Sequence, residues 1–213
     1  MTFLVVIIGW IFSLCLHEFS HALAAYYGGD ITVKDKGYLT FNPLKYTHPV
    51  YSLLLPMIFL MMGGIGLPGG AVYIEKWRLR SREWETVVSL AGPFANALLA
   101  IVLGLVLQLT PVGSSSIGPG VAFLAFLQIS AVVLNLIPLP PFDGFGALEP
   151  HLPMDIRLKL AQTQGMLSWV VLILLWQVPF IGNAFWGVIS LLARLAGIPL
   201  QLAGLGMDQF MFW

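Results

Sequence analysis

Continuous apolar runs, long enough to cross a lipid bilayer, dominate this sequence. About 20 mainly apolar residues span the hydrocarbon core as an α-helix. Inside a bilayer the backbone must satisfy its own hydrogen bonds, so a spanning segment is either a helix or part of a closed barrel. Barrel strands alternate apolar and polar residues, and the runs here do not. The pattern therefore predicts an all-α polytopic membrane protein.

The small number of charges excludes several other classes of protein. Charged residues make up 9% of the 213 residues and hydrophobic residues 58%, whereas a soluble domain carries about 25% charged residues. This composition excludes a cytosolic enzyme and a disordered tail. Ten basic residues balance ten acidic ones, so the basic excess of a nucleic-acid-binding protein is missing. One cysteine excludes a disulfide-stabilised scaffold.

Five segments are predicted to span the membrane: residues 2–27, 84–109, 121–137, 164–178 and 183–195. No positive residue precedes the first run, so we expect a span and not a cleaved signal peptide. A further apolar segment, residues 50–65, contains Pro56 and leads into several glycines, which break helices. We expect it to be re-entrant or interfacial, and a true span is the alternative.

The basic residues predict the orientation. If the first span runs inward, all ten Lys and Arg residues fall on the inner side, including the cluster at residues 76–82 and Arg194. Cytoplasmic loops are enriched in Lys and Arg, so this side is expected to be the cytoplasm. The chain is then a multi-pass integral protein, expected in the cell membrane, and the lipid bilayer surrounds it.

The first predicted span contains the motif that carries chemistry, H-E-x-x-H at residues 17–21. Positions i and i+4 share one face of a helix, so His17 and His21 can bind one metal ion. Glu18 is placed to act as a general base, as in zinc hydrolases. Two buried histidines with Glu18 as counter-ion are the alternative, but ionisable groups inside a membrane are costly and usually functional.

A catalytic zinc ion keeps three protein ligands and one open position. The third ligand must come from elsewhere in the chain. The candidates are His48, Asp143, Glu149 and His151. Asp143 follows the inner end of the third predicted span, so it approaches from the same side of the membrane as His17.

Three motifs in this order resemble the site-2 proteases, which are intramembrane zinc metalloproteases. They are H-E-x-x-H at residues 17–21, A-G-P-F-A-N at 91–96 and N-x-x-P-x-P-P-x-D-G at 135–144. The resemblance implies that His17, His21 and Asp143 bind Zn²⁺ and that Glu18 activates water. It also implies that Asn135 holds the substrate or the oxyanion, and that the substrate is a transmembrane protein.

The resemblance adds three candidate substrate-binding residues. Asn96 would contact the substrate or the oxyanion, and Gly92 lies one helical turn before it; close helix packing is the alternative. Val72 belongs to a glycine-flanked segment, residues 67–74, that could form a β-like edge for an extended substrate. A plain connecting loop is the alternative there.

We expect one membrane-embedded metalloprotease domain over residues 1–213, with a catalytic core at about 4–146 and trailing helices at 164–195. The site would open toward the cytoplasmic side, and PDZ and CBS domains are not expected. The alternative functions are a non-proteolytic metal-binding or transport protein and an inactive protease-like scaffold. The sequence leaves the oligomeric state open.

Overall fold

The computed structural model describes residues 1–45 and 72–211, and these contain helices but no β-strand. The helices are α1 (Thr2–Gly28), α2 (Thr32–Asp35), α4 (Arg82–Leu109), α5 (Gly118–Asn135), α6 (Asp143–Leu148), α7 (Met154–Gln162), α8 (Gln164–Gln177), α9 (Pro179–Leu195) and α10 (Leu200–Phe210). Short 3-10 turns occupy Pro43–Lys45, Lys76–Arg78, Pro111–Ser114 and Glu149–His151. The predicted segment 50–65 and residues 67–71 of the predicted edge lie outside the described residues, and residues 72–74 form no regular element.

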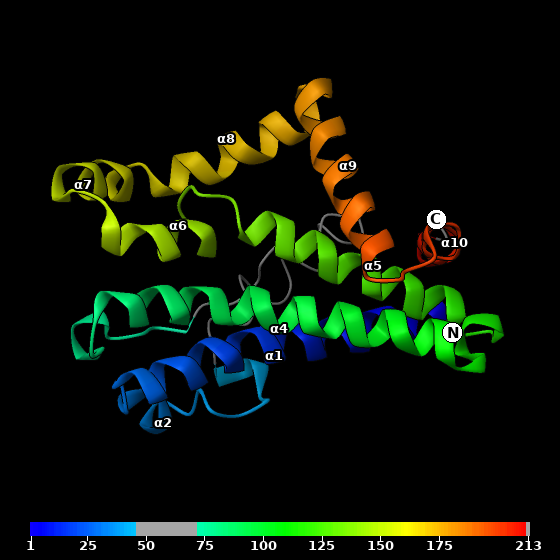
Figure 1. Cartoon of the computed structure of the whole chain (residues 1–213), viewed down its shortest axis with the longest axis horizontal. Helices are drawn as coiled ribbons and strands as arrows, with labels where there is room; N and C mark the ends of the chain where they lie inside the picture. Colours follow the sequence, from blue (N-terminus) through cyan, green and yellow to red (C-terminus); the bar gives the residue numbers. More distant parts are fainter. Residues whose placement is uncertain (46–71, 212–213) are drawn as a thin grey trace.

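Three long helices, α1, α4 and α5, run side by side along the longest dimension of the molecule (Figure 1). In the described part of the chain they are the individual helices long and apolar enough to cross a membrane. They match the first three predicted spans to within three residues at each end. The all-helical architecture is therefore confirmed, and the first three predicted spans correspond to helices that could cross a membrane.

Helix α5 lies at the centre of the molecule. Fourteen of its 18 residues are buried, and it packs against α1, α4, α9 and α10. Apolar residues on all sides of a helix are expected when neighbouring helices surround it. Because α5 is enclosed in this way, its C-terminal residue Asn135 and the turn that follows are held inside the protein.

Helices α1 and α4 are antiparallel, so the end of α1 lies beside the start of α4. Gly28 is close to the Leu79 and Trp84 side chains, and Arg80 N–H donates a hydrogen bond to Gly28 O at 2.9 Å. The cluster at residues 76–82 therefore sits at the end of α1, some 16 Å of helical rise beyond His17. We call this end of the helix bundle the basic end.

The fourth and fifth predicted spans are not two separate membrane-length helices. Helices α8 and α9 have 14 and 17 residues, meet at Val178, and are bent by 94° from each other. Pro179 occupies the first turn of α9, where its missing N–H costs nothing. The predicted spans 164–178 and 183–195 instead leave residues 179–182 as a connecting loop. The described residues support three spans, or four if α8 and α9 together form one bent span.

The prediction that all ten basic residues share one side is wrong for Arg194. Gln108 Nε2 donates a hydrogen bond to Gly197 O at 2.7 Å, which places the end of α9 beside the end of α4. Helix α4 has 28 residues and is about 42 Å long, so Arg194 lies far from the basic end. The single-residue connection at Val178 leaves no loop by which α9 could return to the basic end.

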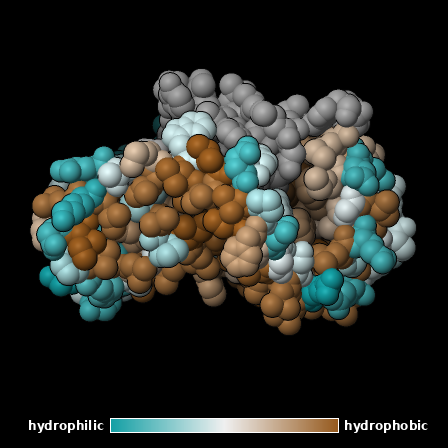
Figure 2. All heavy atoms as spheres, turned by 90° about the horizontal axis from the view of Figure 1, so that it is seen from above, coloured by the Kyte–Doolittle hydropathy of each residue, from teal (hydrophilic) through white to brown (hydrophobic). Residues whose placement is uncertain are grey.

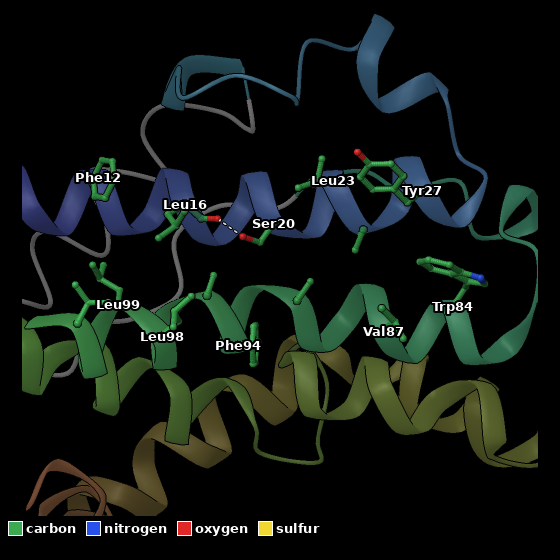
Figure 3. Close-up of a pocket in the computed structure, with 14 residues that line it drawn as sticks. Phe12, Leu16, Ser20, Leu23, Tyr27, Trp84, Val87, Phe94, Leu98 and Leu99 are labelled. Carbon is green, nitrogen blue, oxygen red and sulfur yellow. Dashed lines mark hydrogen bonds between the residues drawn. The ribbon is translucent and has the colours of Figure 1, made fainter. Parts of the chain in front are cut away.

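The surface fits an apolar environment around the middle of the helices. On the face drawn in Figure 2, hydrophobic residues cover much of the middle, and hydrophilic ones gather mainly toward the two ends. A groove of about 680 Å³ between α1 and α4 is lined mainly by apolar side chains (Figure 3). The one serine in this groove, Ser20, donates its hydroxyl hydrogen to Leu16 O at 2.7 Å. The groove therefore offers mainly apolar contact.

Candidate metal centre

The metal-binding motif lies in the second half of α1, facing the protein interior. His17, Glu18 and His21 are all buried. The i and i+4 spacing puts both imidazoles on one helix face, with ring centroids 4.6 Å apart. The two Nε2 atoms are 3.0 Å apart. The sequence-predicted pair is thus assembled within a single helix.

Asp143 reaches this pair from the turn after α5. Its Oδ2 is 3.3 Å from His17 Nε2, and its Oδ1 is 3.5 Å from His21 Nε2. One ligand atom from each of the three residues lies within 4.8 Å of the others. Gly144 allows the fold-back, because a Cβ at this position would lie 2.5 Å from Leu136 C.

A backbone carbonyl fixes the orientation of His21. Its Nδ1 lies 2.7 Å from Val88 O, which can only accept a hydrogen bond, so Nδ1 carries the proton. Nε2 then keeps its lone pair and points toward Asp143. A metal-ligating histidine is typically held in this way by a second partner.

The donor set fits Zn²⁺. Two imidazole nitrogens and one carboxylate, with a fourth position open, are typical of a catalytic zinc site. Asp143 Oδ2 is buried and makes no hydrogen bond within the described residues, although it lies close to His17. An unsatisfied carboxylate oxygen facing two imidazoles would be costly unless a cation completes the site.

Glu18 is held by the segment that follows residue 71. Its Oε2 accepts a hydrogen bond from Val72 N–H at 3.1 Å. Further along this segment, Asp30 Oδ2 accepts a hydrogen bond from Glu75 N–H at 2.8 Å. Hydrogen bonds from Arg78 and Lys36 lower the pKa of Glu75 to about 2. The segment is thus tied to both Glu18 and the end of α1.

The centre opens into a pocket of about 540 Å³. It is lined by His17, Glu18, His21, Val72, Tyr73, Ile74, Lys76, Leu79, Glu85, Val88, Ser89, Asn135, Pro141 and Asp143. Asn135 and Val72 are therefore beside the proposed chemistry. Asn96 is buried on α4 and is not among the lining residues; its Oδ1 has no hydrogen-bond partner in the described part of the chain.

The other candidates for the third ligand are engaged elsewhere or lie outside the described residues. His151 Nε2 is 3.0 Å from Thr86 Oγ1. Glu149 forms ion pairs with Lys76 and Arg157. His48 is outside the described ranges. Of the three candidates that the structure describes, Asp143 is the one that contacts the histidine pair.

Gly92 has a different environment from the one expected for a substrate-binding residue. A Cβ at this position would lie 2.6 Å from His17 Nε2 and would also overlap His21 Nε2. The glycine lets α4 approach the two imidazoles closely.

Sequence reasoning missed two supporting groups. The Val88 carbonyl that holds His21 belongs to the backbone, which no residue pattern reveals. Asp30 is fully buried and binds both Thr32 and Glu75, but in the sequence it only marks the end of an apolar run. Its place directly after two glycines was the available signal for a structural role.

Replacing Gly92 by alanine is expected to lower zinc affinity about 10- to 100-fold, because the new methyl group displaces the imidazoles. Competition with a zinc chelator measures this change. Gly187→Ala in α9 is the control, since a Cβ there meets nothing within 4 Å. Wild-type affinity in Gly92→Ala would show that the close approach of α4 is unimportant.

Two buried histidines and a partly buried aspartate that converge beside a glutamate in a helical membrane protein have the arrangement of a metal-dependent hydrolase. The family model for peptidase family M50 matches residues 3–117. "Putative zinc metalloprotease Rip2" of Mycobacterium tuberculosis is 46% identical over 213 residues, covering 99% of this chain and 81% of that protein. "Putative zinc metalloprotease YwhC" of Bacillus subtilis is 30% identical over 196 residues, covering 86% and 85%. No solved structure matches the chain.

The chain belongs to peptidase family M50, the site-2 protease family. It is a zinc metalloprotease and an integral membrane protein. The family resemblance inferred from the three sequence motifs is thereby confirmed.

Proposed function

We propose that this protein is an intramembrane protease that cleaves peptide bonds in or near the transmembrane helices of other membrane proteins. One observation carries the proposal: the three donor atoms converge on a helix long enough to span the bilayer, about 16 Å of helical rise before its end. A peptide bond at that depth belongs to a membrane-embedded chain. Such cleavage would release part of a membrane protein, as in regulated intramembrane proteolysis.

His17, His21 and Asp143 hold the zinc ion in this proposal. Bound Zn²⁺ would polarise the scissile carbonyl and make the attacking water more acidic. Val88 O keeps the proton of His21 on Nδ1, so that Nε2 remains a ligand. The fixed ring orientation supports a site that is organised before the substrate arrives.

Glu18 takes the proton from the attacking water on its carboxylate and passes it to the leaving amine. A positioned general base of this kind contributes about 10²- to 10⁴-fold to the rate. The hydrogen bond from Val72 N–H occupies Oε2 and leaves Oε1 for the water. Asn135, which lines the same pocket, donates its amide N–H to the oxyanion.

The substrate must unwind, because a helix hides its peptide groups in its own hydrogen bonds. Residues 72–74 flank the pocket, and we assign them the role of an edge that an extended substrate strand contacts. Gly92 acts from α4 by letting this helix approach the histidines closely, whereas Asn96 does not line the pocket and is assigned no contact with the substrate. The whole chain then acts as one catalytic domain.

The basic end faces the cytoplasm in this proposal, as the positive-inside rule requires, and the membrane is the cell membrane. Nine of the ten basic residues precede α4, begin it as Arg82, or lie in α7, and this distribution supports the assignment. The pocket is lined in part by Lys76 and Leu79, which belong to the basic end, and this supports an opening on the same side.

The test uses purified protein with single-span substrates in lipid vesicles. We expect about one zinc per chain and cleavage within or beside the substrate helix. A chelator should stop cleavage and added zinc restore it. Metal flux across the vesicle membrane without peptide cleavage would instead identify a transport protein. Zinc binding with neither activity would identify an inactive scaffold.

A further inference from the structure

We propose that Glu85 forms a subsite for the cationic side chain of a substrate Lys or Arg. The subsite would lie in the cleft that leads from the metal centre to the basic end. This inference rests on the proposed protease function and specifies which substrates the site prefers.

Glu85 lies on the face of α4 that borders the metal centre. Glu85, Val88, Ser89 and Gly92 follow the i, i+3, i+4, i+7 spacing of one helix face. Two of them touch the histidines: Gly92 approaches both rings, and Val88 O contacts His21 Nδ1. Glu85 and Ser89 line the pocket itself. The carboxylate therefore belongs to the wall of the catalytic cleft.

The Glu85 carboxylate has no hydrogen-bond or ion-pair partner in the described residues that would offset the burial of its oxygen. Its Oε2 is shielded from solvent and has no hydrogen-bond partner among the described residues. No ion pair to Glu85 occurs in residues 1–45 and 72–211. A shielded, unpaired carboxylate oxygen is unfavourable, and a cationic donor from a ligand would relieve that cost.

The other charged groups of the pocket are already used. Asp143 faces the histidine pair, and Glu18 is bonded to Val72. Lys76 is paired with Glu149 at 2.5 Å, so it is not a counter-ion for Glu85. Glu85 thus remains the carboxylate of this pocket that a substrate cation can pair with.

The position of Glu85 defines the substrate register. Gly92 and Glu85 are seven residues apart on α4, which is about 10 Å along the helix. An extended substrate advances about 3.3 Å per residue, so Glu85 lies near the third residue from the scissile bond. This residue is on the side of the bond that leads toward the basic end.

The expected ligand follows from the charge pattern of membrane proteins. Transmembrane helices carry Lys and Arg in their cytoplasmic flanks. A substrate cleaved near the cytoplasmic end of its helix would bring such a residue into the cleft. The alternative is purely structural: an acidic residue in the first turn stabilises a helix through its dipole. Glu83 lies two residues before Glu85 in the same turn. It shares that structural role but does not line the pocket.

The test compares two membrane-helix substrates, after the scissile bond has been mapped by mass spectrometry with the wild type. They differ only at the third to fifth residues on the cytoplasmic side, which are Lys in one and Gln in the other. We expect the wild type to cleave the Lys substrate with about tenfold higher kcat/KM. Glu85→Gln should cleave the two substrates with equal kcat/KM. Glu85→Lys should favour a third substrate that carries Glu at the same positions. Glu83→Gln is the matched control and should keep the ratio.

The outcomes separate this inference from the proposed function. Equal cleavage of both substrates by the wild type would refute the subsite and leave the protease function intact. A ratio that survives in Glu85→Gln, with activity lowered equally on both substrates, would show that the role is structural. Loss of the preference for the Lys substrate in Glu83→Gln would show that the preference comes from the overall negative charge at the start of α4 and not from Glu85 itself. Failure of the zinc-loaded wild type to cleave any substrate would refute both proposals.

Discussion

Replacing Glu18 by glutamine is expected to lower kcat about 10²- to 10⁴-fold, while the protein keeps about one zinc per chain. Glutamine has nearly the same shape, and its amide oxygen can still accept the hydrogen bond from Val72 N–H. What it cannot do is take a proton from water. The substitution therefore removes the general base and leaves the donor atoms of His17, His21 and Asp143 unchanged.

The measurement combines single-turnover cleavage of a membrane-helix substrate with metal analysis of the same sample. Single-turnover conditions separate the chemical step from product release. Glu83→Gln carries the same change in an exposed side chain at the start of α4 and should cleave like the wild type. Cleavage by Glu18→Gln at the wild-type rate would exclude Glu18 as the base, even though it lies beside the histidines.

The local part of the site was predictable, because helix geometry alone brings together residues four apart. The His17–His21 pair needs nothing beyond α1. Asp143 lies more than a hundred residues later, and its approach depends on how α5 packs against α1 and α4. Composition and periodicity do not predict that packing. The motif resemblance predicted Asp143 as a ligand, and in the structure its carboxylate lies beside the histidine pair.

The errors in the fold prediction arose where a short connection decides the direction of the chain. The length of the apolar runs identifies α1, α4 and α5 well, because a helix that crosses a membrane must be apolar over its whole span. It does not say whether Pro179 begins a new helix at once or begins a connecting loop. Both readings suit a proline, and packing of Ile189 and Ala193 into the core decides for the bend. The bend between α8 and α9 also determines where Arg194 lies, so the predicted position of this residue was wrong for the same reason.

Replacing Asp143 by asparagine is expected to lower zinc affinity by more than about 100-fold, since even residues that only support a ligand cost 10- to 100-fold. A neutral amide oxygen is a much weaker zinc donor than a carboxylate, and the two imidazoles alone do not complete a three-ligand site. Zinc bound at 100 times its dissociation constant stabilises the folded protein by about 2.7 kcal/mol. For a chain of this size that corresponds to a rise in Tm of about 5–10 °C.

Thermal unfolding with and without zinc tests this directly. The wild type and Glu18→Gln should both show the zinc-dependent rise, because both retain the donor set. Asp143→Asn should show little or none at the same zinc concentration, and its cleavage should fall with its zinc content. Asp155→Asn, an exposed substitution in the first turn of α7, should behave as the wild type. A full zinc-dependent rise in Asp143→Asn would mean that the carboxylate beside the histidines is not a ligand, and the third donor would have to be sought elsewhere in the chain.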